Sequence, residues 1–418
     1  FPTRRSSDLV QPQVPLTRYL QADGQPLGEL PACAENTEQL RVLYRQMLLT
    51  RLFDQKAVAL QRTGRIGTYA PTLGQEAIGV VLGSLMHAED VLVPYYRDTA
   101  VQLLRGVRME EILLYWGGDE RGSAYADPAV AEDFPPCVPI ATQALHACGV
   151  ASAFRIRGQA RVAVTTRGDG ATSKGDFLEA LNVAGAWQLP VVFVVNNNQW
   201  AISVPRHLQC AAATLAQKAL GAGIPGEQVD GNDVLALHEC LGRALQRARQ
   251  GKGPSLVECL SYRLGDHTTA DDASRYRDSA QVRQAWEAEP LRRAGQRQRA
   301  VADQAGAEQR CERRRVARVG HAQGVAPDSH ATQLGVAVGQ RHIQRRIARR
   351  SGVDLHLDVG DIWHRIDRQF LVAVDAHGSH QHHGEHHHQA LLDGELDQAF
   401  EHASVPAING CALQKPCR

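Results

Sequence analysis

Two polar motifs, each following an apolar run, constrain the fold of this chain more than any other feature. Gly168-Asp169-Gly170 follows the run at residues 160–166, and Asn196-Asn197-Asn198 ends the run at residues 189–195. Both runs are short and contain several β-branched residues, as buried strands do, and residues 176–184 between them carry apolar side chains at helical intervals. Strand, turn, helix and strand make a parallel βαβ unit. The sequence therefore predicts an α/β fold, a parallel sheet flanked by helices.

We expect the two motifs to form one site, because the carboxyl ends of neighbouring parallel strands lie at the same edge of a sheet. The Asp169 carboxylate and an asparagine side-chain carbonyl are oxygen ligands of the kind that a hard divalent cation takes. Gly168 and Gly170 leave backbone N–H groups accessible to phosphate at the start of a helix. Gly-Asp-Gly alone is also typical of a plain strand-to-helix turn, but its spacing from the asparagines favours a binding site.

Four blocks, in order, resemble the α subunit of the thiamin-dependent 2-oxo acid dehydrogenases, which is the E1 component of the pyruvate and branched-chain complexes. One block is the pair of motifs above; the others are residues 65–77, Tyr95-Tyr96-Arg97-Asp98 and residues 262–272. The resemblance extends from about residue 37 to residue 293. It implies a thiamin diphosphate-binding fold in which this chain supplies the half-site for diphosphate and Mg²⁺.

Carried over position by position, the resemblance implies a role for ten residues. The implied Mg²⁺ ligands are Asp169, the side chain of Asn198 and the backbone carbonyl of Trp200. The other implied cofactor contacts are the backbone at Gly170 and Ala171, the side chains of Tyr96, Arg97 and Arg263, the aliphatic wedge Ile140, and His267, which is also the implied catalytic residue. Arginine suits such a site because its charge-assisted hydrogen bonds match phosphate geometry.

Two of these residues have ordinary structural alternatives. Ile140 matches the residue that bends the cofactor, but its type is equally typical of a core isoleucine. His267 matches a histidine that contacts phosphate and helps to pass the acyl group to lipoyl, whereas loop histidines are commonly just solvated. Arg263 and Asp271-Asp272, which flank His267, favour the functional interpretation. Asp266 departs from the family pattern, and its charge would be unfavourable near diphosphate unless it faces solvent or Arg263.

The resemblance also implies partners. In this family the glutamate and the apolar wall at the aminopyrimidine ring come from a second subunit, and about 250 family-like residues leave no room for a second such domain. The expected enzyme is an α₂β₂ heterotetramer that binds thiamin diphosphate and Mg²⁺ between the α subunit and the E1 β subunit. It would decarboxylate a 2-oxo acid oxidatively and transfer the acyl group to the lipoyl domain of the E2 acyltransferase.

Pyruvate is the expected substrate. Residues 74–77, 214–219 and 222–226 resemble the pyruvate-type α subunits. Residues 229–233 and 140–143 instead resemble the branched-chain type, so a branched-chain 2-oxo acid dehydrogenase is the alternative, and acetoin dehydrogenase is a third. Substrate choice depends largely on the pocket of the β subunit, which this chain does not contain.

Composition argues against several other classes of protein. A net charge of +1 at pH 7 is unfavourable for a general nucleic-acid or membrane-surface partner. The chain has no apolar run of about eighteen residues, the length typical of a membrane-spanning helix. Its nine cysteines lack Cys-x-x-Cys spacing. We therefore expect reduced thiols in a cytoplasmic bacterial protein, without disulfides or a zinc site.

The chain divides into three parts. Residues 1–36 are interpreted as an N-terminal extension that is partly non-native, because the first nine lack both Met and an apolar targeting core. Residues 37–293 are the expected thiamin diphosphate-binding domain. Residues 294–418 are rich in Arg and His and lack recognisable helix caps and turns. They are interpreted as a frameshifted or foreign tail that is poorly ordered.

A histidine tract within this tail provides a non-enzyme alternative. Seven histidines lie between His377 and His388. Imidazole binds Ni²⁺ and Zn²⁺, so the tract could make the tail a metal-binding or interaction appendage. Such tracts are weakly specific, because composition alone does not fix a ligand geometry.

Overall fold

The computed structural model describes residues 13–301 of the 418 in the chain. The expected N-terminal remnant, nearly all of the expected tail and the histidine tract lie outside the described residues.

A six-stranded parallel sheet organises the described residues, and it confirms the predicted fold class. Its strands, in spatial order, are β1 (Leu16–Thr17), β7 (Gly226–Asp230), β8 (Ser255–Leu260), β4 (Val191–Asn197), β3 (Ala163–Gly168) and β2 (Val91–Val93). A separate antiparallel hairpin, β5 (Trp200–Ala201) and β6 (Val204–Pro205), follows β4. The predicted βαβ unit is present as β3, a helix and β4, which are paired in parallel.

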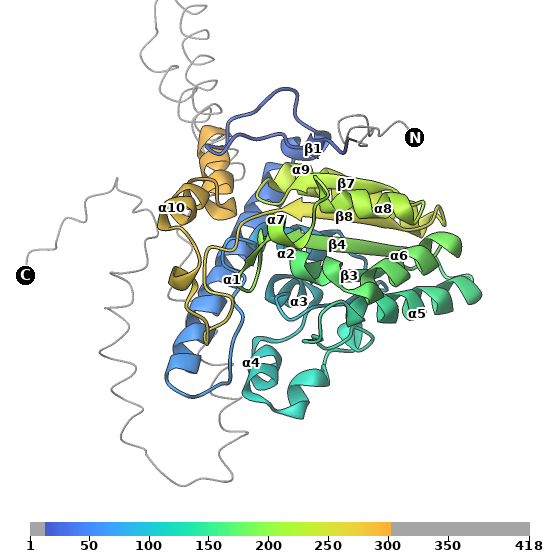
Figure 1. Cartoon of the computed structure of the whole chain (residues 1–418), viewed down its shortest axis with the longest axis horizontal. Helices are drawn as coiled ribbons and strands as arrows, with labels where there is room; N and C mark the ends of the chain where they lie inside the picture. The colour runs from blue at the N-terminus through green and yellow to red at the C-terminus, as the bar shows by residue number, and fades with distance from the viewer. Residues whose placement is uncertain (1–12, 302–418) are drawn as a thin grey trace, which may run out of the picture. The chain divides into compact units, whose positions relative to one another are not determined.

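Helices cover both faces of the sheet (Figure 1). The α-helices are α1 (Thr37–Arg62), α2 (Glu76–Leu85), α3 (Thr99–Arg105), α4 (Met109–Gly117), α5 (Thr142–Ile156), α6 (Gly175–Ala186), α7 (Arg206–Gln209), α8 (Lys218–Gly221), α9 (Val234–Arg249) and α10 (Ser279–Glu287). The short 3-10 helices are η2 (Ala32–Glu35), η3 (Glu120–Ser123), η4 (Pro128–Val130), η5 (Asp169–Ser173), η6 (Leu215–Gln217) and η7 (Ala273–Arg275).

Strand alternation explains how the sheet holds two helical layers. Successive residues of a strand point to opposite faces. In β4, Val192 and Val194 pack in the core shared with α1, α2 and α9, whereas Val191, Phe193 and Val195 pack in the core shared with α5 and α6. All five side chains are fully buried, so β4 is a central strand and its carboxyl end is fixed from both faces.

The folded region extends beyond both boundaries expected from sequence. β1 joins the sheet upstream of residue 37: the Asp233 carboxylate accepts the backbone N–H groups of Tyr19 and Leu20, each at 2.7 Å. At the other end, helical residues 290–301 continue past residue 293. Leu291 on this helix is buried in the core with α1.

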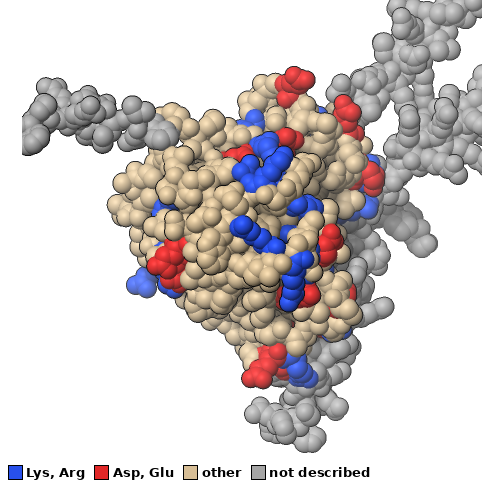
Figure 2. Space-filling model, turned by 90° about the vertical axis from the view of Figure 1, so that its right-hand side faces the viewer, with Lys and Arg blue, Asp and Glu red and all other residues tan. Residues whose placement is uncertain are grey.

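The amino ends of the strands form a face where α5 and α6 also end. Figure 2 shows that basic and acidic side chains are mixed on this face. Within residues 13–301, no helix is both long and apolar enough to span a membrane. The six cysteines in this range are free thiols.

Candidate functional site

The Asp169 carboxylate lies at the carboxyl end of β3, next to the end of β4. Gly168 is paired with Asn196 in the sheet, which places the two predicted motifs side by side. Asp169 is buried, and its carboxylate accepts one side-chain hydrogen bond, from Gln209 Nε2 at 3.2 Å. Burial raises its pKa to about 6, although hydrogen bonds and the Arg263 charge oppose the shift. A buried carboxylate with so few partners favours a cation beside it.

Two further oxygens belong to the segment that follows β4. The Asn198 side-chain Oδ1 accepts the backbone N–H of Trp200 at 3.2 Å, and its Nδ2 donates to Gln75 Oε1 at 2.9 Å. The Trp200 carbonyl accepts a long hydrogen bond of 3.4 Å from Arg263. An amide oxygen has two lone pairs, so the Asn198 Oδ1 keeps one for a cation.

The turn after β3 packs closely against β5. Asp169 opens the 3-10 helix η5, and α6 begins only at Gly175, so one tight turn separates the motif from the predicted helix. A Cβ atom on Gly170 would lie 2.6 Å from the Cβ of Ala201, a contact that side chains do not tolerate. Glycine at this position therefore lets the turn pack against β5, with Ala171 buried beside it.

A cation cluster, defined as Arg97, Arg263 and His267, lies near these oxygens. Arg97 and Arg263 are 3% and 1% exposed, yet both approach the same imidazole nitrogen: His267 Nδ1 is 3.3 Å from an Arg97 nitrogen and 3.5 Å from Arg263 Nη1. Guanidinium groups only donate, so Nδ1 accepts and the neutral ring carries its proton on Nε2.

The cluster shifts the pKa values of its own members. Burial, with the charges of Arg97 and Arg263, lowers the pKa of His267 to about 4. Burial and the Arg97 charge lower the pKa of Arg263 to about 10. The Nε atoms of both arginines are buried and have no hydrogen-bond partner among the described residues. Buried, mutually repelling cations with free donors fit a ligand that has several negative oxygens.

The loop that carries His267 is held by its own side chains. Arg263 donates to the Ile202 carbonyl and to the Tyr276 hydroxyl, both at 2.8 Å. Tyr276 in turn donates to Asp271, whose carboxylate also accepts the backbone N–H of His267 at 2.9 Å. His267 is therefore half-buried and ordered by contacts, unlike a solvated loop histidine.

The remaining predicted residues surround the cluster or lie beside it. The Tyr96 and His267 rings meet edge-on, with 6.0 Å between their centroids. The Arg97 Cζ atom lies 5.6 Å from the centroid of the Tyr96 ring. Ile140 precedes α5 and is 44% exposed, which does not fit the core alternative. Asp266 is exposed and accepts the Ala273 backbone N–H at 2.9 Å, so its charge faces solvent.

Three residues at the site were not assigned a role from sequence. Gln75 holds Asn198, Gln209 donates to Asp169, and Tyr276 links Arg263 to Asp271. Gln75 lies in residues 65–77, one of the blocks that resemble the family, so its position in the sequence could have indicated a role at the site. Nothing in the spacing or residue type distinguished Gln209 or Tyr276.

Known proteins are similar to the part of the chain that carries these residues. The model of the family described as dehydrogenase E1 component matches residues 44–333. A relative named 3-methyl-2-oxobutanoate dehydrogenase subunit alpha, from Mycobacterium tuberculosis, is 45% identical over 261 residues, which are 62% of this chain and 71% of the relative. A relative named pyruvate dehydrogenase E1 component subunit alpha, from Staphylococcus aureus, is 40% identical over 282 residues, which are 67% of this chain and 76% of the relative.

Proposed function

The chain belongs to the dehydrogenase E1 component family, as an α subunit of a thiamin diphosphate-dependent 2-oxo acid dehydrogenase, and from this premise we propose that it takes part in the oxidative decarboxylation of pyruvate. The observation that carries the proposal is the meeting of the cation cluster with the oxygens at the ends of β3 and β4. Cations for a diphosphate and oxygens for a divalent metal thus lie at one edge of the sheet.

We assign the metal site to Asp169, the Asn198 side chain and the Trp200 carbonyl, with Mg²⁺ as the ion. Within residues 13–301, no group of three or more His, Cys, Asp or Glu side chains could hold a metal. One carboxylate with two neutral oxygens suits Mg²⁺, which proteins commonly bind through one or two carboxylates together with the phosphates of a ligand. These three groups would hold the ion beside the diphosphate of the bound cofactor.

The chain's side chains bind and orient the cofactor, whose thiazolium supplies the carbanion chemistry when it is bound. Arg97 and Arg263 donate to the diphosphate, with Tyr96 beside them and the backbone of Gly170 and Ala171 at the metal end. Because His267 Nδ1 faces two guanidinium groups, its proton lies on Nε2. We assign His267 to donating a hydrogen bond from Nε2 to the lipoyl sulfur during acyl transfer.

We propose an E1 β subunit as the partner that completes the site, in an α₂β₂ assembly that acts on the lipoyl domain of E2. Apolar side chains near the site support this partner: Ile140, Ile202 and Val204 are 44%, 55% and 43% exposed. Exposed apolar groups of this kind mark surfaces that another protein covers. Both relatives described above are bacterial, and we place this chain in the bacterial cytoplasm.

Pyruvate is proposed as the substrate on the sequence blocks at residues 74–77, 214–219 and 222–226. The second candidate is 3-methyl-2-oxobutanoate, because the relative named for that substrate is 45% identical. The two acids differ in the size of the group beside the keto carbon. A pocket distinguishes them by apolar contacts, at about 1–3 kcal/mol for each methylene.

A reconstitution assay tests the proposal. The chain alone, the chain with its β subunit, and the β subunit alone would each be supplied with thiamin diphosphate, Mg²⁺ and either acid, and CO₂ release measured. We expect activity only in the mixture, with a higher kcat/KM for pyruvate. Comparable rates from the chain alone would contradict the half-site, and preference for 3-methyl-2-oxobutanoate would reassign the substrate.

A further inference from the structure

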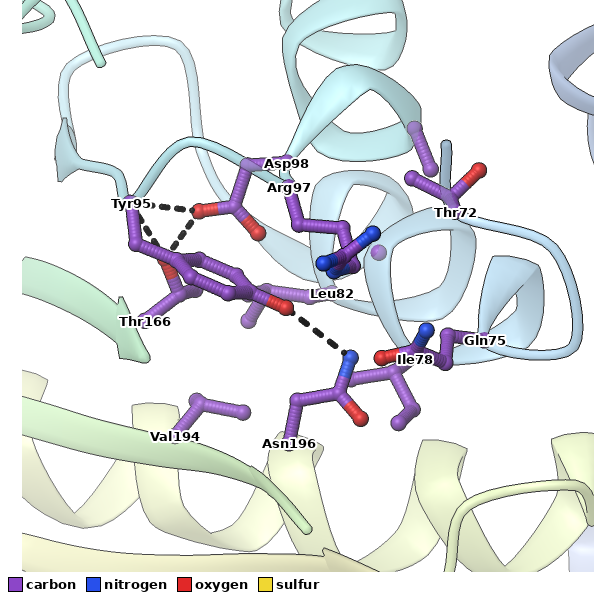
Figure 3. Close-up of a pocket in the computed structure, with 12 residues that line it drawn as sticks. Thr72, Gln75, Ile78, Leu82, Tyr95, Arg97, Asp98, Thr166, Val194 and Asn196 are labelled. Carbon is purple, nitrogen blue, oxygen red and sulfur yellow. Dashed lines mark hydrogen bonds between the residues drawn. The ribbon is translucent and has the colours of Figure 1, made fainter. Parts of the chain in front are cut away.

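A small internal cavity lies behind the carboxyl ends of β3 and β4. Its volume is about 10 Å³, and Figure 3 shows Arg97 and Gln75 turned toward it, with Asn196 entering from β4. Gln75 is 2% exposed, and its Nε2 has no hydrogen-bond partner within residues 13–301. A buried amide with one free end is uncommon, because an unmade hydrogen bond costs free energy.

The orientation of Gln75 follows from the bonds of Asn198. The Trp200 backbone N–H donates to Asn198 at 3.2 Å, so the amide end facing Trp200 must be the oxygen. The Asn198 NH₂ group is then directed at Gln75, 2.9 Å away, where only an oxygen can receive it. Gln75 therefore presents Oε1 to Asn198, and its own NH₂ group is left without a partner among the described residues.

This arrangement has a consequence for metal binding. A divalent cation needs the oxygen end of an asparagine, and the NH₂ end would repel it. The Trp200 N–H holds Asn198 Oδ1, and Gln75 Oε1 holds Asn198 Nδ2, so the amide is held at both ends. A reversed Asn198 would lose the hydrogen bond from the Trp200 N–H.

Gln75 is itself held rigidly. Its backbone N–H donates to the Thr72 carbonyl at 2.8 Å, which closes a turn. Thr72 is bonded to Asp54 on α1 through its backbone N–H and its hydroxyl, both at 2.6 Å. Glu76, on the other side, is bonded to Arg51 on α1 at 2.8 Å. The side chain that orients Asn198 thus rests on a turn tied to a 26-residue helix at both ends.

We propose that Gln75 is a positioning residue that, together with the Trp200 backbone N–H, holds the side-chain amide of the metal ligand Asn198 in place. The inference rests on the proposed function, because that proposal makes Asn198 a ligand. Gln75 does not touch the metal or the cofactor in this role. Hydrogen-bond partners of metal ligands commonly change metal affinity by about 10- to 100-fold when they are removed.

The test compares three variants of the chain reconstituted with its β subunit. Gln75→Met removes the acceptor at similar size, and Gln75→Glu keeps an oxygen acceptor for Asn198. Gln102→Met is the matched control, because Gln102 is also buried, at 4% exposed, and its Nε2 donates to Tyr125 at 3.1 Å. Mg²⁺ would be titrated at saturating thiamin diphosphate and followed by calorimetry, with the unfolding midpoint measured for every variant.

We expect Gln75→Met to weaken Mg²⁺ binding by about 10- to 100-fold, and Gln75→Glu to stay within about threefold of the wild type. Gln102→Met should match the wild type in Mg²⁺ affinity whatever its stability. Equal Mg²⁺ affinity in Gln75→Met and Gln102→Met would overturn the inference and leave the proposed function intact. If Gln75→Met fails to fold, Gln75→Glu decides: a loss of Mg²⁺ affinity in this folded variant would overturn the inference. A wild-type complex that binds thiamin diphosphate equally well without Mg²⁺ would contradict the proposed function itself.

Discussion

Two arginines with little solvent exposure, Arg263 and Arg51, have opposite surroundings in this chain. Arg263, in the cation cluster, has no carboxylate within salt-bridge distance among the described residues, and burial and Arg97 lower its pKa to about 10. Arg51, on α1, has only 13% of its side chain exposed, but it donates to Glu76 at 2.8 Å and to Glu289 at 2.6 Å. Burial lowers its pKa, but the two carboxylates outweigh that effect and raise the pKa above the ordinary value.

The two regions around these arginines differ in what they need from a ligand. We use the name α1 anchor for Arg51 and Asp54 together with residues 69–76, which they hold. In the α1 anchor, Arg51 pairs with two carboxylates and Asp54 accepts three hydrogen bonds, so these polar groups are paired without a ligand. In the cation cluster, like charges face one another and donors are free, so the region gains most when an anion binds. Pro71 connects the two, since its carbonyl accepts a 2.5 Å hydrogen bond from Arg97.

Loss of the His267 imidazole should give the largest effect. In His267→Ala, we expect reductive acylation of a lipoyl domain to fall by about 100- to 1,000-fold, the usual contribution of a hydrogen-bond donor at a developing negative charge. Decarboxylation measured with an artificial electron acceptor should fall by less than about tenfold, because that assay needs no contact between Nε2 and lipoyl.

The control for this prediction is His87→Ala. His87 is exposed and paired with Glu89, outside the cation cluster, and this variant should match the wild type in both assays. Equal losses in both assays for His267→Ala would mean that the residue acts through cofactor binding, and no loss in either would remove it from the site.

A substitution in the α1 anchor should lower the free energy of unfolding. Asp54 accepts hydrogen bonds from the Tyr69 hydroxyl, the Thr72 N–H and the Thr72 hydroxyl, all at 2.6 Å. Asp54→Ala leaves these buried donors unpaired, so we expect the free energy of unfolding to fall by about 2–4 kcal/mol in a denaturant titration. Glu38→Ala, at an exposed pair on the same helix, should change it by less than about 0.5 kcal/mol. A change below about 1 kcal/mol in Asp54→Ala would refute the anchoring role.

Arg97→Met should weaken the cation cluster without abolishing it. Loss of a charge-assisted hydrogen bond worth about 1.5–3 kcal/mol predicts a fall of about 10- to 100-fold in thiamin diphosphate affinity, measured by calorimetry. The pKa of His267 should also rise from about 4 toward 6.5, because one of the two charges that lower it is gone. An NMR titration of the imidazole measures this shift, and an unchanged pKa would contradict the cluster.

The same shift determines the sign of a pH effect. The folded-state pKa of His267 lies below the ordinary 6.5. Between about pH 6.5 and pH 4, the unfolded chain therefore binds a proton at this residue and the folded chain does not. His267 therefore costs no stability above about pH 6.5 and destabilises the fold as the pH falls from there toward 4. This acid-induced loss should be smaller in Arg97→Met than in the wild type.

The βαβ unit and its two motifs could be predicted because their signals are local. Buried strands of valine and other β-branched residues, a helical apolar period and a glycine-flanked aspartate lie within residues 160–198. The turn between the first strand and the helix was predicted less accurately. The 3-10 helix η5 separates Asp169 from α6, so the Gly-Asp-Gly motif does not lie directly at the start of the regular helix.

The supporting contacts could not be predicted, because they join distant parts of the chain. Gln75 and Asn198 are 123 residues apart, and Tyr19 and Asp233 are 214 apart. Residue type and spacing carry no information on such pairs, whereas the tertiary structure makes them neighbours. The same holds for Asp266, whose direction toward solvent depends on the path of its loop.

Above all, we propose that the carboxyl ends of β3 and β4 bind Mg²⁺ and diphosphate through Asp169. The most direct test is a calorimetric titration of thiamin diphosphate, with Mg²⁺, into the complex with β, for the wild type and Asp169→Ala. We expect binding by the wild type, a loss of at least about 100-fold in the variant, and similar unfolding midpoints, because the Asp169 carboxylate has one side-chain partner among the described residues. Unchanged affinity in a folded Asp169→Ala complex would contradict this assignment of the site.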